Sequence, residues 1–161
     1  MVVLYRYNFM YSRIISLVFG LLVIIGAAAF LTAGTFTASR RDVISARIGP
    51  QVFYLRVADD AEKREHGLGG TPALAPDEGM LFVFPDERMH AIWMKDMLIP
   101  IDIVWVSASS VVIDLREDVS PDSFPSIFAP ASSARFVVEL SAGAAKAFGI
   151  KVGDKIEFLG E

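Results

Sequence analysis

The sequence predicts an α+β fold that is mainly β, a compact antiparallel barrel-like or sandwich domain with two short helices. Apolar residues alternate, or run together, over stretches of roughly four to eight residues, which is the spacing of strands. Clusters of Gly, Pro, Asp and Ser separate these stretches and indicate turns. Only two segments have helical character, and both are short. An apolar helix is expected to precede the domain.

The first part of the domain contains one strand, one helix and a loop. Residues 52–57 have strand character. Residues 60–66 predict a short helix, which Gly67 stops. Residues 71–78 hold two prolines and predict a loop.

Short strands make up most of the remaining domain. Pro85 is expected to end the first of them, because proline donates no hydrogen bond to a sheet. Ser141 is expected to cap a helix over residues 142–148, with Gly149 ending it. The expected strands are residues 80–84, 90–95, 101–106, 111–115, 134–140 and 155–158.

The beginning of the chain predicts a signal peptide or a membrane anchor. No charged residue occurs in residues 14–36, a length sufficient to cross a bilayer. Arg6 and Arg13 precede this run, and no acidic residue occurs before Asp42, which is the pattern of an export signal. We therefore expect an exported protein, periplasmic or otherwise extracytoplasmic. Cleavage of the signal and anchoring in the inner membrane through residues 14–36 both remain open.

The chain therefore divides into residues 1–41 and a single globular domain over residues 42–161. That domain carries 11 basic and 19 acidic residues, a net charge of −8. No basic patch able to neutralise phosphates is evident, so we expect no nucleic acid partner. The chain has no cysteine, which excludes disulfides and a lipoprotein anchor.

Residues 79–106 combine apolar strand character with side chains that normally lie in water. His90, Lys95 and Asp102 all occur there, together with both tryptophans. Strand alternation places Asp102 on an otherwise apolar side of its strand. A turn after Lys95 could bring its ammonium group close to the Asp102 carboxyl group.

Three interpretations of Lys95 and Asp102 are open, and the simplest is that both side chains are exposed at the surface. A buried ion pair would fix strand register, provided that further hydrogen bonds offset desolvation. Alternatively, the two residues border a pocket with Trp93, in which Lys95 binds an anionic ligand group or acts as an acid or base. With His90 as a further acid–base group, that pocket would suit a hydrolase or an isomerase.

The loop from Ser120 to Ser133 adds two aromatic candidates. Its prolines exclude regular ladder hydrogen bonding, yet Phe124 and Phe128 lie among them. These side chains either fold onto the core or form a lid or a partner-binding edge.

The sequence lacks the signatures of several site classes. It has no nucleophile elbow and no phosphate-binding glycine loop. Neither His66 nor His90 belongs to a metal-ligand spacing. We therefore expect no cofactor and no metal site.

Five motifs occur in the domain between about Gln51 and Phe158, namely Arg64–Leu68, Asp77–Pro85, Trp93–Lys95, Ile99–Asp102 and Gly149–Asp154. In order and spacing they resemble domain of unknown function family 192. The resemblance implies a compact, mainly β domain, often preceded in bacteria by an export signal or lipid anchor, and it implies no established reaction. Members often have Met where this chain has Gly69, and many carry a cysteine pair in the loop that corresponds to residues 120–133, which has no cysteine in this chain.

By motif, the resemblance directs attention to Trp93, Met94, Lys95, Pro100 and Asp102. Together with Phe124 and Phe128, these are the candidate binding residues. We expect a non-catalytic binding module of the envelope, with a small, partly apolar pocket or edge. Its expected partner is a small molecule or an envelope protein, and its N-terminal segment is expected to contact the membrane.

Overall fold

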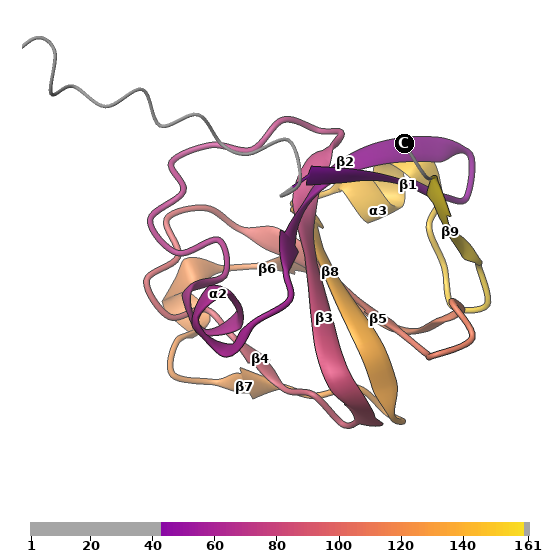
Figure 1. The fold of residues 1–161 in the computed structure, drawn as a ribbon. Coiled ribbons are helices and arrows are strands. Elements are labelled where there is room, and N and C mark those ends of the chain that lie inside the picture. The colour runs from indigo at the N-terminus through magenta and orange to yellow at the C-terminus, as the bar shows by residue number, and fades with distance from the viewer. Residues whose placement is uncertain (1–42, 160–161) are drawn as a thin grey trace, which may run out of the picture. The chain divides into compact units, whose positions relative to one another are not determined.

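The computed structural model describes residues 43–159, which form a mainly β unit with two short α-helices (Figure 1). This confirms the predicted mainly-β character and the two short helices. The predicted apolar helix at the start of the chain lies outside the described residues. Within residues 43–159, none of the helices has the length and apolar character needed to span a bilayer.

Nine strands, two α-helices and one 3-10 helix make up the described region. The helices are α2 (Ala61–His66), η2 (Pro121–Ser123) and α3 (Ala144–Phe148). The strands are β1 (Val43–Ile48), β2 (Gln51–Ala58), β3 (Glu78–Arg88), β4 (Ile92–Trp93), β5 (Ile101–Val106), β6 (Val112–Val119), β7 (Ile127–Phe128), β8 (Ala134–Ser141) and β9 (Ile156–Leu159).

Seven strands form one curled sheet in the order β6-β5-β8-β3-β2-β1-β9, a half-barrel. Its two edge strands approach each other at one end. There the backbone N–H of Val112 donates to the Asp154 carbonyl (2.8 Å), and that of Ile156 donates to the Ser110 carbonyl (2.9 Å). These bonds satisfy backbone groups that an open edge would leave unpaired.

The prediction of a wholly antiparallel arrangement is wrong for one pair of strands. β2 and β3 run parallel, from Tyr54 opposite Glu78 to Ala58 opposite Phe82. Parallel neighbours need a crossover connection, and α2 with the following loop provides it. All other neighbouring strands in the sheet are antiparallel.

The sheet separates two apolar cores, and β5 contributes to both. All six of its residues are buried. Ile101, Ile103 and Trp105 belong to one core, and Val104 and Val106 belong to the other, as strand alternation predicts. In Figure 1, α2, β4 and β7 lie on one side of β3 and β8, whereas α3 and β9 lie on the other.

Four predicted boundaries needed correction, and β1 and β7 were not predicted. The strand expected over residues 111–115 is β6, which continues to Val119. β3 continues through Pro85 to Arg88, because its register against β8 shifts after Val83 and leaves the proline outside the ladder. The strand predicted over residues 90–95 is reduced to β4, which pairs with β7 in a separate two-stranded sheet. Ser141 belongs to β8, and Gly143 takes the N-cap position of α3 with φ +81° and no side-chain capping bond.

The predicted proximity of Asp102 to Lys95 is wrong. The fully buried Asp102 side chain faces the core that contains Val104, and it accepts three backbone hydrogen bonds. Its Oδ1 accepts from the N–H groups of Asp118 (2.8 Å) and Gly143 (3.1 Å), and its Oδ2 accepts from that of Ala145 (2.8 Å). Asp102 is therefore a brace, but it joins β6 and α3 to β5 and has no cationic partner among residues 43–159.

Replacing Asp102 tests this brace. Asp102→Ala should lower the free energy of unfolding by about 3–5 kcal/mol, because it leaves three part-buried or buried N–H groups without their acceptor. Asp102→Asn should lower it by about 1–3 kcal/mol, because its amide N–H₂ would face one donor instead of accepting from it. Urea unfolding would measure both effects.

Lys95→Met is the matched control, because the lysine has no contact with Asp102. We expect its free energy of unfolding to stay within about 0.5 kcal/mol of the wild type. A large loss in Lys95→Met together with no loss in Asp102→Ala would contradict the assignment.

Candidate functional site

A small pocket opens between α2, β3 and β4, on the side of the sheet opposite Asp102. Its volume is about 100 Å³. Apolar and aromatic side chains contribute about half of its walls, and charged or polar side chains contribute the other half. The lining residues are Arg64, Glu65, His66, Gly67, Leu68, Phe82, Phe84, Ala91, Ile92, Trp93, Lys95, Met97 and Glu139.

Glu139 is the polar group of this pocket that the fold buries most deeply. It lies on β8, opposite Met80 of β3 and Ile103 of β5, and is only 4% exposed. Its Oε2 has no hydrogen-bond partner among residues 43–159. One other buried side-chain oxygen of the described residues has no hydrogen-bond partner, namely Oδ1 of Asp86. It lies 3.6 Å from Nε2 of His90.

Burial sets the protonation of Glu139. Removing its carboxyl group from water raises the pKa of Glu139 to about 8, and the attraction of Arg56 lowers it by less. At neutral pH the side chain is therefore mainly a neutral acid. It can donate one O–H hydrogen bond, which an ionised carboxylate cannot do.

Gly67 keeps the space beside this carboxyl group open. Its φ is +54°, a conformation that residues with a Cβ atom rarely adopt. A Cβ atom there would lie 3.2 Å from Cζ of Phe82 and 3.9 Å from Oε2 of Glu139. The glycine that ends α2 thus serves both the turn and the pocket.

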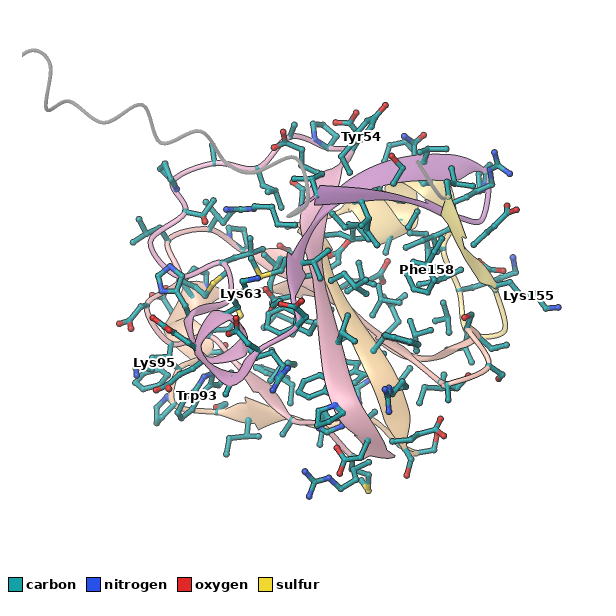
Figure 2. All side chains as sticks on the ribbon, in the orientation of Figure 1. Tyr54, Lys63, Trp93, Lys95, Lys155 and Phe158 are labelled. Carbon is teal, nitrogen blue, oxygen red and sulfur yellow. The ribbon has the colours of Figure 1, made fainter. Side chains whose placement is uncertain are left out.

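The mouth of the pocket carries two cationic side chains beside aromatic rings. Nζ of Lys95 lies 5.6 Å from the centroid of Trp93, and Figure 2 shows these two residues next to each other at the surface. The Lys95 ammonium group is 4.0 Å from Oε1 of Glu65. The Arg64 guanidinium group lies 5.5 Å from the Phe84 centroid.

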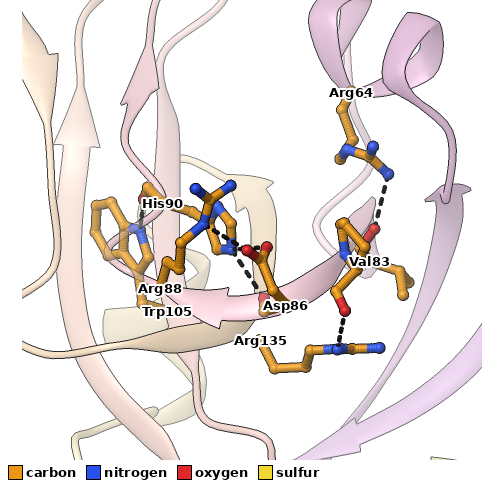
Figure 3. Close-up of polar contacts among 8 residues, drawn as sticks. Arg64, Val83, Asp86, Arg88, His90, Trp105 and Arg135 are labelled. Atoms are coloured by element: carbon orange, nitrogen blue, oxygen red, sulfur yellow. Dashed lines mark hydrogen bonds and ion pairs between the residues drawn. The ribbon is translucent and has the colours of Figure 1, made fainter.

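Backbone contacts hold the arginine and the nearby turn in place (Figure 3). Nη1 of Arg64 donates to the Val83 carbonyl at 2.9 Å, and Arg135 donates to the Pro85 carbonyl. Nε1 of Trp105 donates to the His90 carbonyl at 2.8 Å. These contacts fix the end of β3 and the residues that lead to β4.

The structure brings only two of the candidate binding residues to the pocket, namely Trp93 and Lys95. Met94 is buried in the core, and Pro100 is exposed and outside the lining. Asp102 lies in the other core.

The two aromatic residues of the proline-rich loop lie beside β4. Phe128 is half-buried, pairs with Ile92 and packs against the core. Phe124 is exposed and meets Trp93 edge-on, with ring centroids 6.1 Å apart. Trp93 and Ile127, with Ala91 and Ile92, line a separate and more open apolar hollow of about 240 Å³.

Lys95, Asp102 and His90 do not converge. The imidazole ring of His90 stacks on Phe84 at 3.6 Å, with its Nε2 3.0 Å from the Asp86 carbonyl, and it does not line the pocket. Asp102 lies across the sheet from Lys95. The acid–base arrangement expected for a hydrolase or an isomerase is therefore not formed by these residues. Among residues 43–159, no group of three or more His, Asp or Glu side chains is placed to hold a metal ion.

Most of the lining residues, among them Glu139 and Gly67, were not predicted from the sequence. A signal for Glu139 was present, because Phe136, Val138 and Leu140 share one face of β8. The opposite face holds Val137 and Glu139, and on a strand in the middle of a covered sheet that face is also buried. An acidic residue at such a position needs either a partner or a role.

The raised pKa of Glu139 predicts a pH-dependent stability. The unfolded chain loses the Glu139 proton near pH 4.5, whereas the folded protein keeps it to about pH 8. The free energy of unfolding should therefore fall as the pH rises through this interval. Ionisation of Glu139 should lower it by about 1.4 kcal/mol per pH unit. Urea unfolding at a series of pH values would measure the slope.

Glu139→Gln is the control, because the amide is isosteric and does not titrate. The difference in stability between wild type and variant isolates the contribution of this group. Parallel stability curves for the two proteins between pH 5 and pH 8 would show that Glu139 is ionised in the folded state.

Comparison with solved structures supports the fold as a recurrent one. A proposed transcription regulator from Sinorhizobium meliloti 1021 superposes with a TM-score of 0.69 at 29% identity, covering 72% of this chain and 93% of that one. A protein of unknown function from Novosphingobium aromaticivorans DSM 12444 gives a TM-score of 0.68 at 27% identity, covering 71% and 84%.

The sequence comparisons agree with the resemblance seen in the motifs. A UPF0127 protein of Thermococcus sibiricus is 30% identical over 106 residues, and the match spans 65% of this chain and 65% of that relative. The family model DUF192, described as uncharacterized ACR, matches residues 43–158. The chain belongs to this family, domain of unknown function family 192.

Proposed function

We propose that this domain is a non-catalytic binding module of the cell envelope, and that its ligand occupies the pocket beside Glu139. The single observation that supports this is the unpaired, buried Oε2 of Glu139 at the pocket wall. An unpaired buried polar atom costs about 1–3 kcal/mol of stability. A ligand that supplies the missing hydrogen bond would recover that energy on binding.

The residues that form the walls of the pocket favour ligand binding over catalysis. Phe82, Phe84 and Trp93 give apolar contact, and one buried polar group fixes orientation, which is the usual composition of a ligand site. No serine or threonine hydroxyl of residues 43–159 lines it. A small molecule would use the pocket of about 100 Å³, whereas an envelope protein would have to use the exposed Trp93 and Phe124.

The envelope location rests on the N-terminal sequence. A basic start followed by an uncharged run at residues 14–36 is typical of export. We expect the protein in the periplasmic or membrane fraction of the cell. The mass of the intact purified protein then distinguishes a cleaved signal from a retained anchor, and a full-length protein found only in the cytoplasm would contradict export.

The binding role can be tested on residues 42–161. The S. meliloti chain is 93% covered by the match, so a chain made almost entirely of this domain folds on its own. A fragment screen observed through the indole N–H resonance of Trp93 should find ligands for the pocket. The resonance of the buried Trp105 serves as an internal reference.

Two glycine variants provide a matched pair for this screen. Gly67→Ala should weaken the hits by tenfold or more, because its Cβ atom occupies the space between Phe82 and Glu139. Gly70→Ala also places alanine at positive φ (+70°), but it meets nothing within 4 Å. It should therefore bind the same fragments with unchanged affinity. Hits that Gly67→Ala leaves unaffected would place the ligand elsewhere, and a screen without hits would contradict the binding role.

A further inference from the structure

The charged groups around the pocket define the kind of ligand that it can admit. Arg64, Glu65 and His66 face the mouth from the end of α2, and Lys95 faces it after β4. Arg56 of β2 also acts on Glu139 through its charge. Among the described residues, Glu65 is the one carboxylate at the mouth, and its side chain is 73% exposed. The entrance is therefore electropositive.

Glu139, the polar group inside the pocket, also suits a negatively charged ligand. Glu139 is mainly protonated at neutral pH, so it offers a hydrogen-bond donor to its surroundings. Bonds from such a donor to an ionised acceptor are short and strong. A ligand ammonium group would instead have to pass Arg64 and Lys95, and Glu139 would have to lose its proton to receive it.

Lys95 is placed to contribute to ligand binding. Its ammonium group is half-exposed and only 4.0 Å from the exposed Glu65, a weak surface pair. Its position over the Trp93 ring keeps it at the mouth. A negatively charged ligand group would therefore gain a cationic neighbour there without breaking a strong existing bond.

We propose that the pocket binds small organic carboxylates, with the carboxyl group of Glu139 donating a hydrogen bond to the ligand carboxylate and Lys95 attracting it at the mouth. The apolar part of the ligand would lie against Phe82 and Phe84. This inference rests on the binding function proposed above and specifies its ligand class.

Three probes that share a phenyl ring test the sign of the charge: benzoate, benzylamine and benzyl alcohol. Titrations followed at the Trp93 indole N–H should show benzoate binding at least tenfold more tightly than the other two. Raising the pH from about 6 to about 9 should weaken benzoate binding at least tenfold, because Glu139 loses the proton that it donates.

Two variants of Glu139 separate donation from charge. Glu139→Gln keeps a neutral donor, so benzoate should bind within about threefold of wild type and without the loss at high pH. Glu139→Leu removes the donor and should weaken benzoate at least tenfold, while the Trp105 resonance reports that the core is intact. His66 also faces the mouth, so the pH series is repeated in His66→Gln, where the loss at high pH should persist.

The outcomes distinguish this inference from the binding function itself. Tighter binding of benzylamine, or loss of benzoate binding in Glu139→Gln, would overturn the carboxylate assignment while leaving the pocket a binding site. Equal benzoate affinity in the Leu and Gln variants would overturn the role of Glu139. Failure of all three probes, in a domain whose fragment screen gives pocket hits, would also reject carboxylates; failure of the screen itself would reject the binding function.

Discussion

The acceptance of three backbone hydrogen bonds by Asp102 is the interaction on which the arrangement of the domain depends. Asp102 lies on β5, the strand that contributes side chains to both cores. Its carboxyl group ties the end of β6 and the start of α3 to this strand. α3 lacks a side-chain cap of its own, so a residue 41 positions away in sequence supplies the acceptor. Local helix signals alone could not have produced this junction.

A second buried carboxyl group lies close by in the sheet and has the opposite environment. Asp102 pairs with Leu140, and its neighbour Ile103 pairs with Glu139. Because adjacent residues of a strand point to opposite faces, the two carboxyl groups lie on opposite sides of the sheet. Three N–H groups satisfy Asp102, whereas Oε2 of Glu139 has no partner among the described residues. The contrast distinguishes an acid whose oxygens the fold satisfies from one whose buried oxygen the described residues leave unpaired.

Sequence periodicity predicted most strands of the sheet, but it missed β1 and ended β3 too early. Residues 101–106 became β5 without change, and alternation placed Asp102 on its correct side. Periodicity failed where the contacts of a residue depended on partners far away in the sequence. Alternation could say that Asp102 is buried, but not which groups meet it, because Gly143 and Ala145 approach only after the chain has crossed β8. The pocket could not be predicted for the same reason, because its walls come from α2, β3, β4 and β8, which are far apart in the sequence.

The position of Glu139 is costly for the fold, and this cost argues for a role. An apolar residue of similar size between its cross-strand neighbours Met80 and Ile103 would leave no polar atom unpaired. A neutral amide would avoid the loss of stability that ionisation causes at higher pH. Local choices that lower stability in this way are expected mainly at functional sites. The glycine at Gly67 follows the same logic, since it keeps open a space that a methyl group would begin to fill. Both residues lie at the wall of one pocket and lower stability or packing density there, and this coincidence is the basis of the proposed binding function.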